Sequence, residues 1–92
     1  ILVLNNGAYG TIRMHQEREY PSRVSGTNLH NPDFAAVAEA FGIKGFCVRK
    51  TEDFAEAFAE AIKSKTGALL ELMVSLEAIT PRKTITDLRS GG

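Results

Sequence analysis

Apolar residues follow two different patterns along the chain, and together they predict alternating strands and helices. The chain opens on four consecutive branched aliphatic residues, 1–4, and a second apolar run, interrupted by one glutamate, covers 68–74. Runs without alternation are typical of strands covered on both faces of a parallel sheet. We therefore expect a buried strand at each place, with 68–74 in the interior of the sheet.

Three segments have the spacing of helices, with apolar residues returning every three or four positions. The first, 10–19, has only a thin apolar face. The second covers 32–41, and we expect Asn31 to cap its N-terminus with Pro32 in the first turn. The third continues to residue 62 from Thr51, its expected N-cap.

The remaining segments complete the predicted topology. Residues 21–30 lack periodicity and form a long loop, and 45–50 form a short strand whose charged end favours the sheet edge. Residues 84–89 have the composition of a weak helical turn. The order of elements predicts an α/β protein, a three-layer open parallel sheet with crossover helices.

A three-stranded parallel sheet is incomplete, because one edge and one face lack the elements that should cover them. The chain also begins without Met and directly inside an expected strand. We therefore interpret it as a fragment of a longer protein. We expect one domain at 1–89, followed by a disordered tail at 90–92.

Composition and charge exclude several classes of function. Apolar residues make up 43% and charged residues 24% of the chain, as in ordinary globular proteins. Eleven basic and eleven acidic residues cancel, so no net field favours nucleic acid or an anionic membrane. No apolar run has the roughly 20 residues needed to cross a bilayer. The single cysteine, Cys47, forms no internal disulfide, and we expect a cytoplasmic protein.

Chemistry is most strongly indicated where the first strand ends, at Asn5-Asn6-Gly7. Ligands bind at the carboxyl ends of strands in open parallel sheets, and amide and backbone carbonyl oxygens suit Mg²⁺. Asparagine and glycine are also ordinary turn residues. From the residues alone, three hypotheses stay open: an enzyme, a small non-catalytic phosphate- or nucleotide-binding module, and an interaction domain.

Other polar residues give weaker signals. His15 and His30 have no partners at the spacing of metal ligands, and surface positions explain them. The arginines of the first helix and the following loop suit either a phosphate or carboxylate ligand or a solvated helix face. They are Arg13, Arg18 and Arg23.

A family resemblance adds to this interpretation. Residues 1–13, Ile-Leu-Val-Leu-Asn-Asn-Gly-Ala-Tyr-Gly-Thr-Ile-Arg, closely resemble the second half of the thiamine-diphosphate motif. Residues 31–34, 41–42 and 67–71 are similar to closing elements of the same domain, so the resemblance covers nearly the whole chain. The most similar members are 2-oxo-acid enzymes of the acetolactate synthase, glyoxylate carboligase and benzoylformate decarboxylase group. The chain then corresponds to the C-terminal half of the thiamine-diphosphate-binding (pyrophosphate) fold.

The resemblance implies roles for particular residues. The Asn6 side chain and the Ala8 backbone carbonyl would be Mg²⁺ ligands, with the ion bridging to the cofactor diphosphate. His15 falls where acetolactate synthases commonly have a large aromatic residue that lines the substrate channel. The implied cofactor-binding residues are Asn6, Gly7, Ala8, Tyr9, Gly10, Thr11 and Ile12.

The implied function is that of a thiamine-diphosphate- and Mg²⁺-dependent 2-oxo-acid carboligase or decarboxylase, acetolactate synthase-like. No catalytic residue is expected in this chain, because the family's cofactor-activating glutamate lies in another domain on the neighbouring subunit. We therefore expect the fragment to be inactive alone. Its expected partners are the remaining domains of its own chain and a second subunit, in a homo-oligomer. The use of FAD, and the choice between carboligase and decarboxylase, stay open.

Overall fold

The computed structural model describes residues 1–91, which form two compact units. The first unit contains residues 1–5 and 31–74. The second contains 6–30 and the described residues from 75 onward. Gly92, the last residue of the predicted tail, lies outside the described residues.

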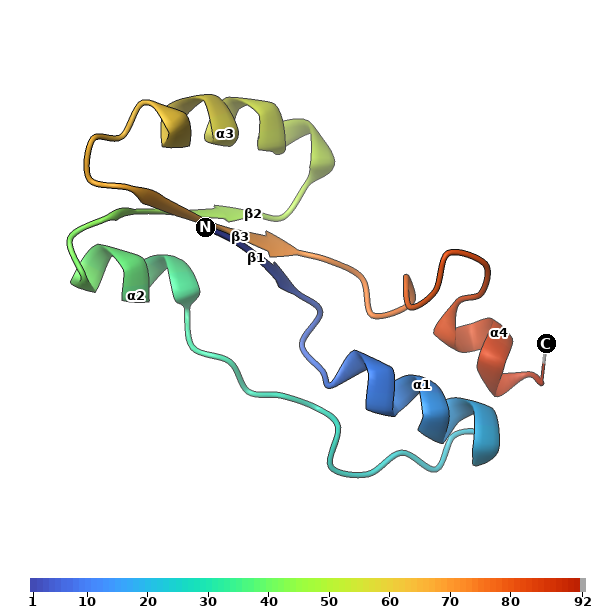
Figure 1. Cartoon of the computed structure of the whole chain (residues 1–92). Helices are drawn as coiled ribbons and strands as arrows, with labels where there is room; N and C mark the ends of the chain where they lie inside the picture. Colours follow the sequence, from blue (N-terminus) through green and yellow to red (C-terminus); the bar gives the residue numbers. More distant parts are fainter. Residues whose placement is uncertain (92) are drawn as a thin grey trace. The chain divides into compact units, whose positions relative to one another are not determined.

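The first unit is a three-layer α/β structure (Figure 1). Its parallel strands are β1 (Leu2–Asn5), β2 (Lys44–Val48) and β3 (Ala68–Met73), in the order β1-β3-β2. Helix α2 (Phe34–Ala40) covers one face of the sheet and helix α3 (Phe54–Ile62) covers the other. The predicted fold class, the interior place of β3 and the edge position of β2 are therefore confirmed.

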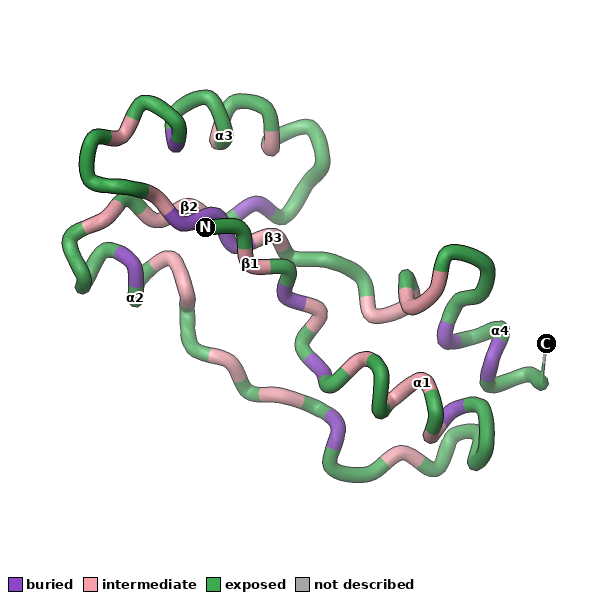
Figure 2. Tube along the Cα trace, viewed as in Figure 1, coloured by how far each residue is buried: buried purple, intermediate pink, exposed green. Residues whose placement is uncertain are grey.

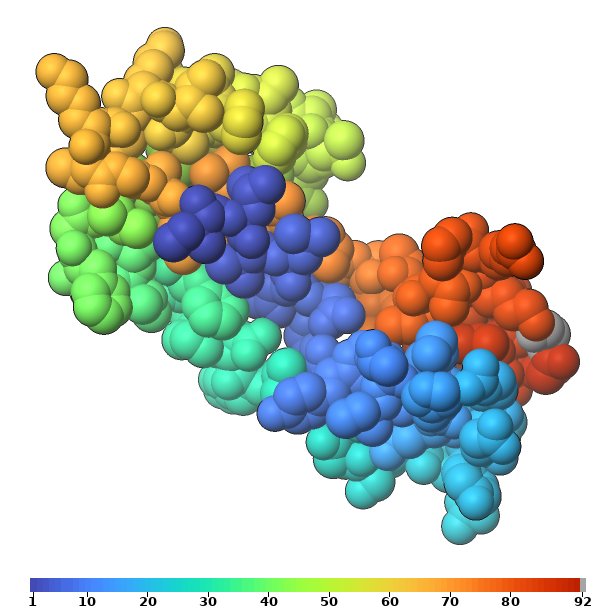
Figure 3. Space-filling model, in the orientation of Figure 1, coloured from blue at the N-terminus to red at the C-terminus, as the bar shows by residue number. Residues whose placement is uncertain are grey.

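Strand β1 is not the buried strand that its apolar run predicts. Leu2 is 50% and Leu4 is 67% exposed. The start of the chain is largely coloured as exposed in Figure 2 and lies at the surface, in dark blue, in Figure 3. The reason is topological, since β1 is an edge strand that pairs only with β3 among the described residues, while helices α2 and α3 pack on β2 and β3. The apolar core lies on β3 instead, where Leu70 is 2% exposed.

Two predicted helix caps are wrong. Asp33, not Asn31, caps α2 by accepting a hydrogen bond from the Ala36 N–H at 3.1 Å. Asn31 instead donates to the side chain of Asn5. Thr51 makes no capping hydrogen bond, because residues Thr51–Asp53 form a 3₁₀ turn, η1, that leads directly into α3.

The second unit is built from two helices that pack side by side, α1 (Gly10–Glu19) and α4 (Ile85–Arg89). Helix α1 has the predicted bounds. Residues 84–89 form more than a weak turn, because Thr84 and Asp87 satisfy each other's backbone N–H groups in a capping box. No helix within residues 1–91 is both long and apolar enough to span a membrane.

Gly45 lies where helix α2 comes very close to the sheet. A Cβ atom at this position would collide with the backbone of Ala35 in α2, which cannot move away as a side chain would. We expect Gly45→Ala to lower the free energy of unfolding by about 1–3 kcal/mol through overpacking. Urea unfolding measures the change, and Lys44→Ala, at an exposed neighbouring position, is the control. Equal stability of the two variants would show that α2 moves away without cost.

Candidate functional site

The turn that follows β1 is held by the side chain of Asn6. Its Oδ1 accepts a hydrogen bond from the Ala8 N–H at 3.1 Å, closing the local turn that asparagine favours. Between them Gly7 has a φ angle of +73°, a conformation that glycine adopts without steric cost. The three residues therefore form a defined turn at which Asn6 and the backbone of Ala8 meet.

The Ala8 backbone is fixed from its other side by residues 27–29. Ala8 pairs with Asn28 in an antiparallel bridge. The flanking hydrogen bonds run from the Leu29 N–H to the Gly7 carbonyl and from the Tyr9 N–H to the Thr27 carbonyl, both at 2.8 Å. In such a pair the central residue turns its own N–H and C=O groups away from the partner segment.

This geometry leaves an oxygen without a partner. The Ala8 N–H points to Asn6, and in an extended residue the carbonyl turns to the same side. Within residues 1–91 no hydrogen bond reaches the Ala8 carbonyl oxygen, although the residue is only 7% exposed. Buried carbonyl groups normally have a partner. An oxygen-binding cation beside Asn6 and Ala8 would supply one.

Gly10 lies against the same turn. A Cβ atom there would stand 2.9 Å from Asn6 Nδ2 and 3.1 Å from Ile79 Cδ1, so only glycine leaves the Asn6 amide in place. Helix α1 starts here without a side-chain cap, which leaves first-turn N–H groups for an anion. A cavity of about 180 Å³ at this helix start is lined by Tyr9, Gly10, Thr11 and Ile12.

The other polar residues named from the sequence lie elsewhere. His15 is exposed on α1 and contacts Arg18, and His30 is exposed in the loop. Arg13 is not on a solvated face, because its guanidinium donates to Asn28 Oδ1 at 2.8 Å. Residues 1–91 contain no cluster of three His, Cys, Asp or Glu side chains that would hold a metal.

Sequence reasoning missed a buried polar network in the first unit. Asn5 donates to Glu71 Oε2 at 2.7 Å and accepts from Asn31 Nδ2 at 2.9 Å. Asn5 is 8% and Glu71 5% exposed. The glutamate within an otherwise apolar strand was the available signal, because a buried carboxylate requires donors. The network fixes the residue from which the Asn6 turn departs.

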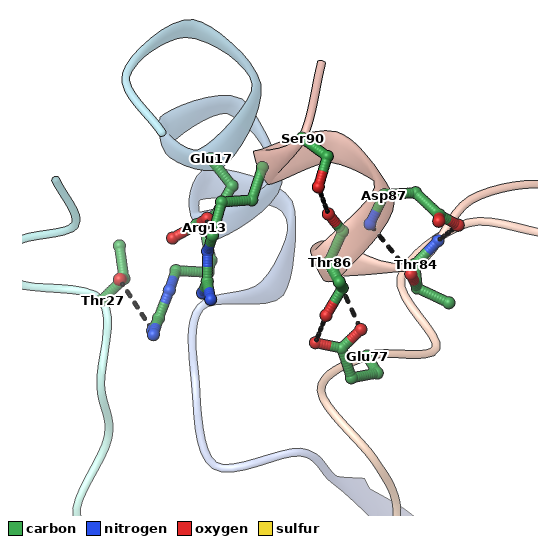
Figure 4. A network of polar contacts seen from close by, with 9 residues as sticks. Arg13, Glu17, Thr27, Glu77, Thr84, Thr86, Asp87 and Ser90 are labelled. Atoms are coloured by element: carbon green, nitrogen blue, oxygen red, sulfur yellow. Dashed lines mark hydrogen bonds and ion pairs between the residues drawn. The ribbon is translucent and has the colours of Figure 1, made fainter. Parts of the chain in front are cut away.

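A second buried carboxylate, Glu17, supports helix α1. Its side chain is fully buried and accepts a hydrogen bond from Arg89 Nε of α4 at 2.6 Å. Figure 4 shows the surrounding network, in which Arg13 points to Thr27. The hydrogen bond from Arg89 holds the pKa of Glu17 below its ordinary value of 4.5, against the opposing effect of burial. Helix α4 thus neutralises a charge that α1 buries.

Comparison with known proteins identifies the family. Residues 1–72 match the model described as "Thiamine pyrophosphate enzyme, C-terminal TPP binding domain". Thiamine pyrophosphate and thiamine diphosphate are the same compound. The chain belongs to the thiamine pyrophosphate enzyme family. The matched residues contain the whole Asn6 turn, strands β1 and β2, and strand β3 apart from its last residue, Met73.

Individual family members agree with this assignment. The chain is 39% identical over 75 residues to the mitochondrial acetolactate synthase of Schizosaccharomyces pombe and 40% identical over 74 residues to the mitochondrial acetolactate synthase catalytic subunit of Saccharomyces cerevisiae. These matches cover 82% and 80% of the chain but only 11% of each relative. A Bacillus subtilis protein, YdaP, whose name describes it as thiamine pyrophosphate-containing, is 38% identical over 88 residues, which cover 90% of the chain and 14% of that protein.

The Glu17 ion pair makes the stability of this family domain sensitive to acid. Because the folded pKa of Glu17 is depressed, its stabilisation is present above pH 4.5 and is lost as the pH falls through the folded pKa. We expect Glu17→Gln to lower the free energy of unfolding at pH 7 by about 1–3 kcal/mol. The variant's stability should also fall less steeply as the pH drops below 4.5. Urea unfolding across this range measures both effects.

The matched control for this experiment is Glu19→Gln. Glu19 lies two residues along the same helix, but its contact with Arg18 is exposed on both sides. Exposed pairs contribute little, so the control should follow the parent profile. Parallel profiles for Glu17→Gln and the parent would show that the buried pair does not set the acid sensitivity.

Proposed function

We propose that this chain supplies part of the Mg²⁺ and diphosphate site of an acetolactate synthase-like enzyme that acts on a 2-oxo acid. The observation that carries the proposal is the carbonyl of the buried residue Ala8, which has no hydrogen bond within residues 1–91 and turns to the side of the Asn6 amide. Membership of the thiamine pyrophosphate family and the acetolactate synthase relatives support it.

Asn6 and Ala8 offer the types of ligand atom that Mg²⁺ prefers, but too few of them to complete its coordination. An amide oxygen and a backbone carbonyl are hard ligands, but Mg²⁺ requires near-octahedral coordination and is usually bound with a carboxylate and phosphate oxygens. Asn6 and Ala8 would supply two ligands. The cofactor diphosphate and a carboxylate outside the Asn6 turn would supply others. We therefore propose that the chain is inactive alone and acts with further domains and a second subunit.

The roles of this chain's residues follow from their positions. Bound thiamine diphosphate would supply the electron sink for decarboxylation and carbon–carbon bond formation. The uncapped start of α1, lined by residues 9–12, would orient the diphosphate through backbone N–H groups and the helix dipole. Gly10 leaves room for the Asn6 amide. His15, exposed on the same helix, is proposed to face the substrate channel.

One observation favours a second candidate function, a non-catalytic phosphate-binding module. The start of α1 offers N–H groups and a small cavity even without a cation. The two functions differ in their metal dependence. A module of this kind would bind inorganic pyrophosphate equally well with and without Mg²⁺. The enzyme site would require the ion.

The Mg²⁺ assignment is tested by Asn6→Ala in the complete enzyme. Loss of one metal ligand should weaken Mg²⁺-dependent binding of thiamine diphosphate at least tenfold, which corresponds to about 1.4 kcal/mol. Calorimetric titration with and without Mg²⁺ measures the effect, and circular dichroism checks the fold. Lys65→Ala, at an exposed loop position of the first unit, is the control. Unchanged cofactor affinity in Asn6→Ala would rule out the assignment.

Gly10→Ala tests the same site without removing a ligand. The added methyl group would displace the Asn6 amide, the mobile end of a side chain, at little cost to the fold. We expect Mg²⁺-dependent cofactor binding to weaken while the thermal unfolding midpoint changes little. Full cofactor affinity in Gly10→Ala would show that the Asn6 amide does not need its observed position.

A further inference from the structure

Residues 25–29, here called the strap, run beside the Asn6 turn without belonging to a helix or to the sheet. Loop residues are normally exposed. Thr27, at the centre of the strap, is nevertheless only 3% exposed. A buried hydroxyl requires hydrogen-bond partners, and those of Thr27 explain how the strap is held.

Two side chains of α1 hold the strap. Thr27 Oγ1 donates to Gln16 Oε1 at 3.0 Å, and Gln16 Nε2 donates to the Ser25 carbonyl at 2.8 Å. Arg13 Nη1 donates to Asn28 Oδ1 at 2.8 Å and reaches Thr27 Oγ1 at 3.4 Å. Arg13 and Gln16 are three residues apart and so lie on one face of the helix. These four contacts thereby bind a loop that has no regular structure of its own.

The strap in turn fixes the backbone of the Asn6 turn. Its hydrogen bonds to Gly7 and Tyr9 lie immediately before and after Ala8. These two bonds set the plane of the Ala8 backbone and hence the direction of its carbonyl. A continuous series of contacts therefore runs from α1 through the strap to the oxygen proposed as a cation ligand.

We propose that Arg13, Gln16 and Thr27 are positioning residues for the divalent cation. They act by holding the strap, which aims the Ala8 carbonyl, and none of them touches the metal or the diphosphate. This inference rests on the proposed function. It assigns Arg13 to the strap, where its guanidinium already bonds Asn28, and away from the phosphate or carboxylate ligand considered from sequence.

The proposal has a signature in metal selectivity. Mg²⁺ demands near-ideal octahedral geometry at about 2.0–2.1 Å, whereas Ca²⁺ accepts flexible geometry at about 2.3–2.6 Å. A loosened strap lets the Ala8 carbonyl drift, which disfavours the stricter ion more. Loss of a structural contact without a positioning role would weaken binding with both ions equally.

The test uses the complete enzyme and calorimetric titration of thiamine diphosphate with Mg²⁺ or Ca²⁺. Thr27→Val removes the hydroxyl and preserves the shape. We expect Mg²⁺-supported binding to weaken about tenfold, the lower end of the range for residues that orient metal ligands. Ca²⁺-supported binding should weaken less. Thr27→Ser, which restores the hydroxyl, should recover the parent ratio of the two affinities, and Thr66→Val, at an exposed threonine of the first unit, should retain it.

Each possible outcome of these titrations either supports or overturns the positioning role of the strap. An unchanged Mg²⁺ to Ca²⁺ affinity ratio in folded Thr27→Val overturns the proposal. If that variant does not fold, Arg13→Lys probes the strap through Asn28 while keeping the charge, and an unchanged ratio there overturns it equally. Asn6→Ala separates the two proposals. Lost binding in Asn6→Ala with a parent-like Thr27→Val refutes the strap alone, whereas normal binding in Asn6→Ala refutes the cation site itself.

Discussion

The need to pair buried carboxylates organises both units of this small protein. Glu71 lies in the central strand and accepts a hydrogen bond from Asn5, while Glu17 is a fully buried residue of α1 and accepts one from Arg89. A buried charge without a partner is strongly unfavourable, so each glutamate restricts where its partner segment lies. In the first unit the restricted segment is the end of β1. In the second it is the C-terminal helix α4.

These polar contacts matter because the apolar core is thin. Core positions such as Leu70 and Ala38 are almost fully buried, yet Phe41 is 83% and Ile62 68% exposed at the ends of their helices. Apolar packing alone is therefore a weak constraint on the first unit. Directional hydrogen bonds from side chains supply the missing constraint, because they fix orientation as well as contact.

The sequence predicted the fold class well because periodicity reports local structure directly. Helix α1 has the expected bounds, and β3 lies in the interior as its apolar run indicated. The exposure of Leu4 was not predictable. An apolar run indicates that a strand is suited to burial, but it does not show whether another element covers that strand. The prediction that Asn31 caps α2 was wrong for a related reason. Asn31 has the right side chain for a cap, but a contact with Asn5, 26 positions away, holds it.

The site was predictable in part. The spacing from Asn6 to Ala8 is local, so a motif contains it, and the structure places the Asn6 amide on the Ala8 N–H. The strap is different, since Thr27 reaches α1 through contacts 11 and 14 residues distant that no periodic pattern encodes. A threonine in a polar loop gives no sign that it will be buried.

The position of Arg89 affects how this domain is delimited. The match to the family model ends at residue 72, so a boundary drawn from that model alone separates Glu17 from the residue that neutralises it. A chain trimmed at that boundary would enclose an isolated negative charge beneath the helix that carries the cofactor motif. Grafting this motif into another scaffold therefore means transferring residues 75–91 with it, although no residue of that segment belongs to the motif itself.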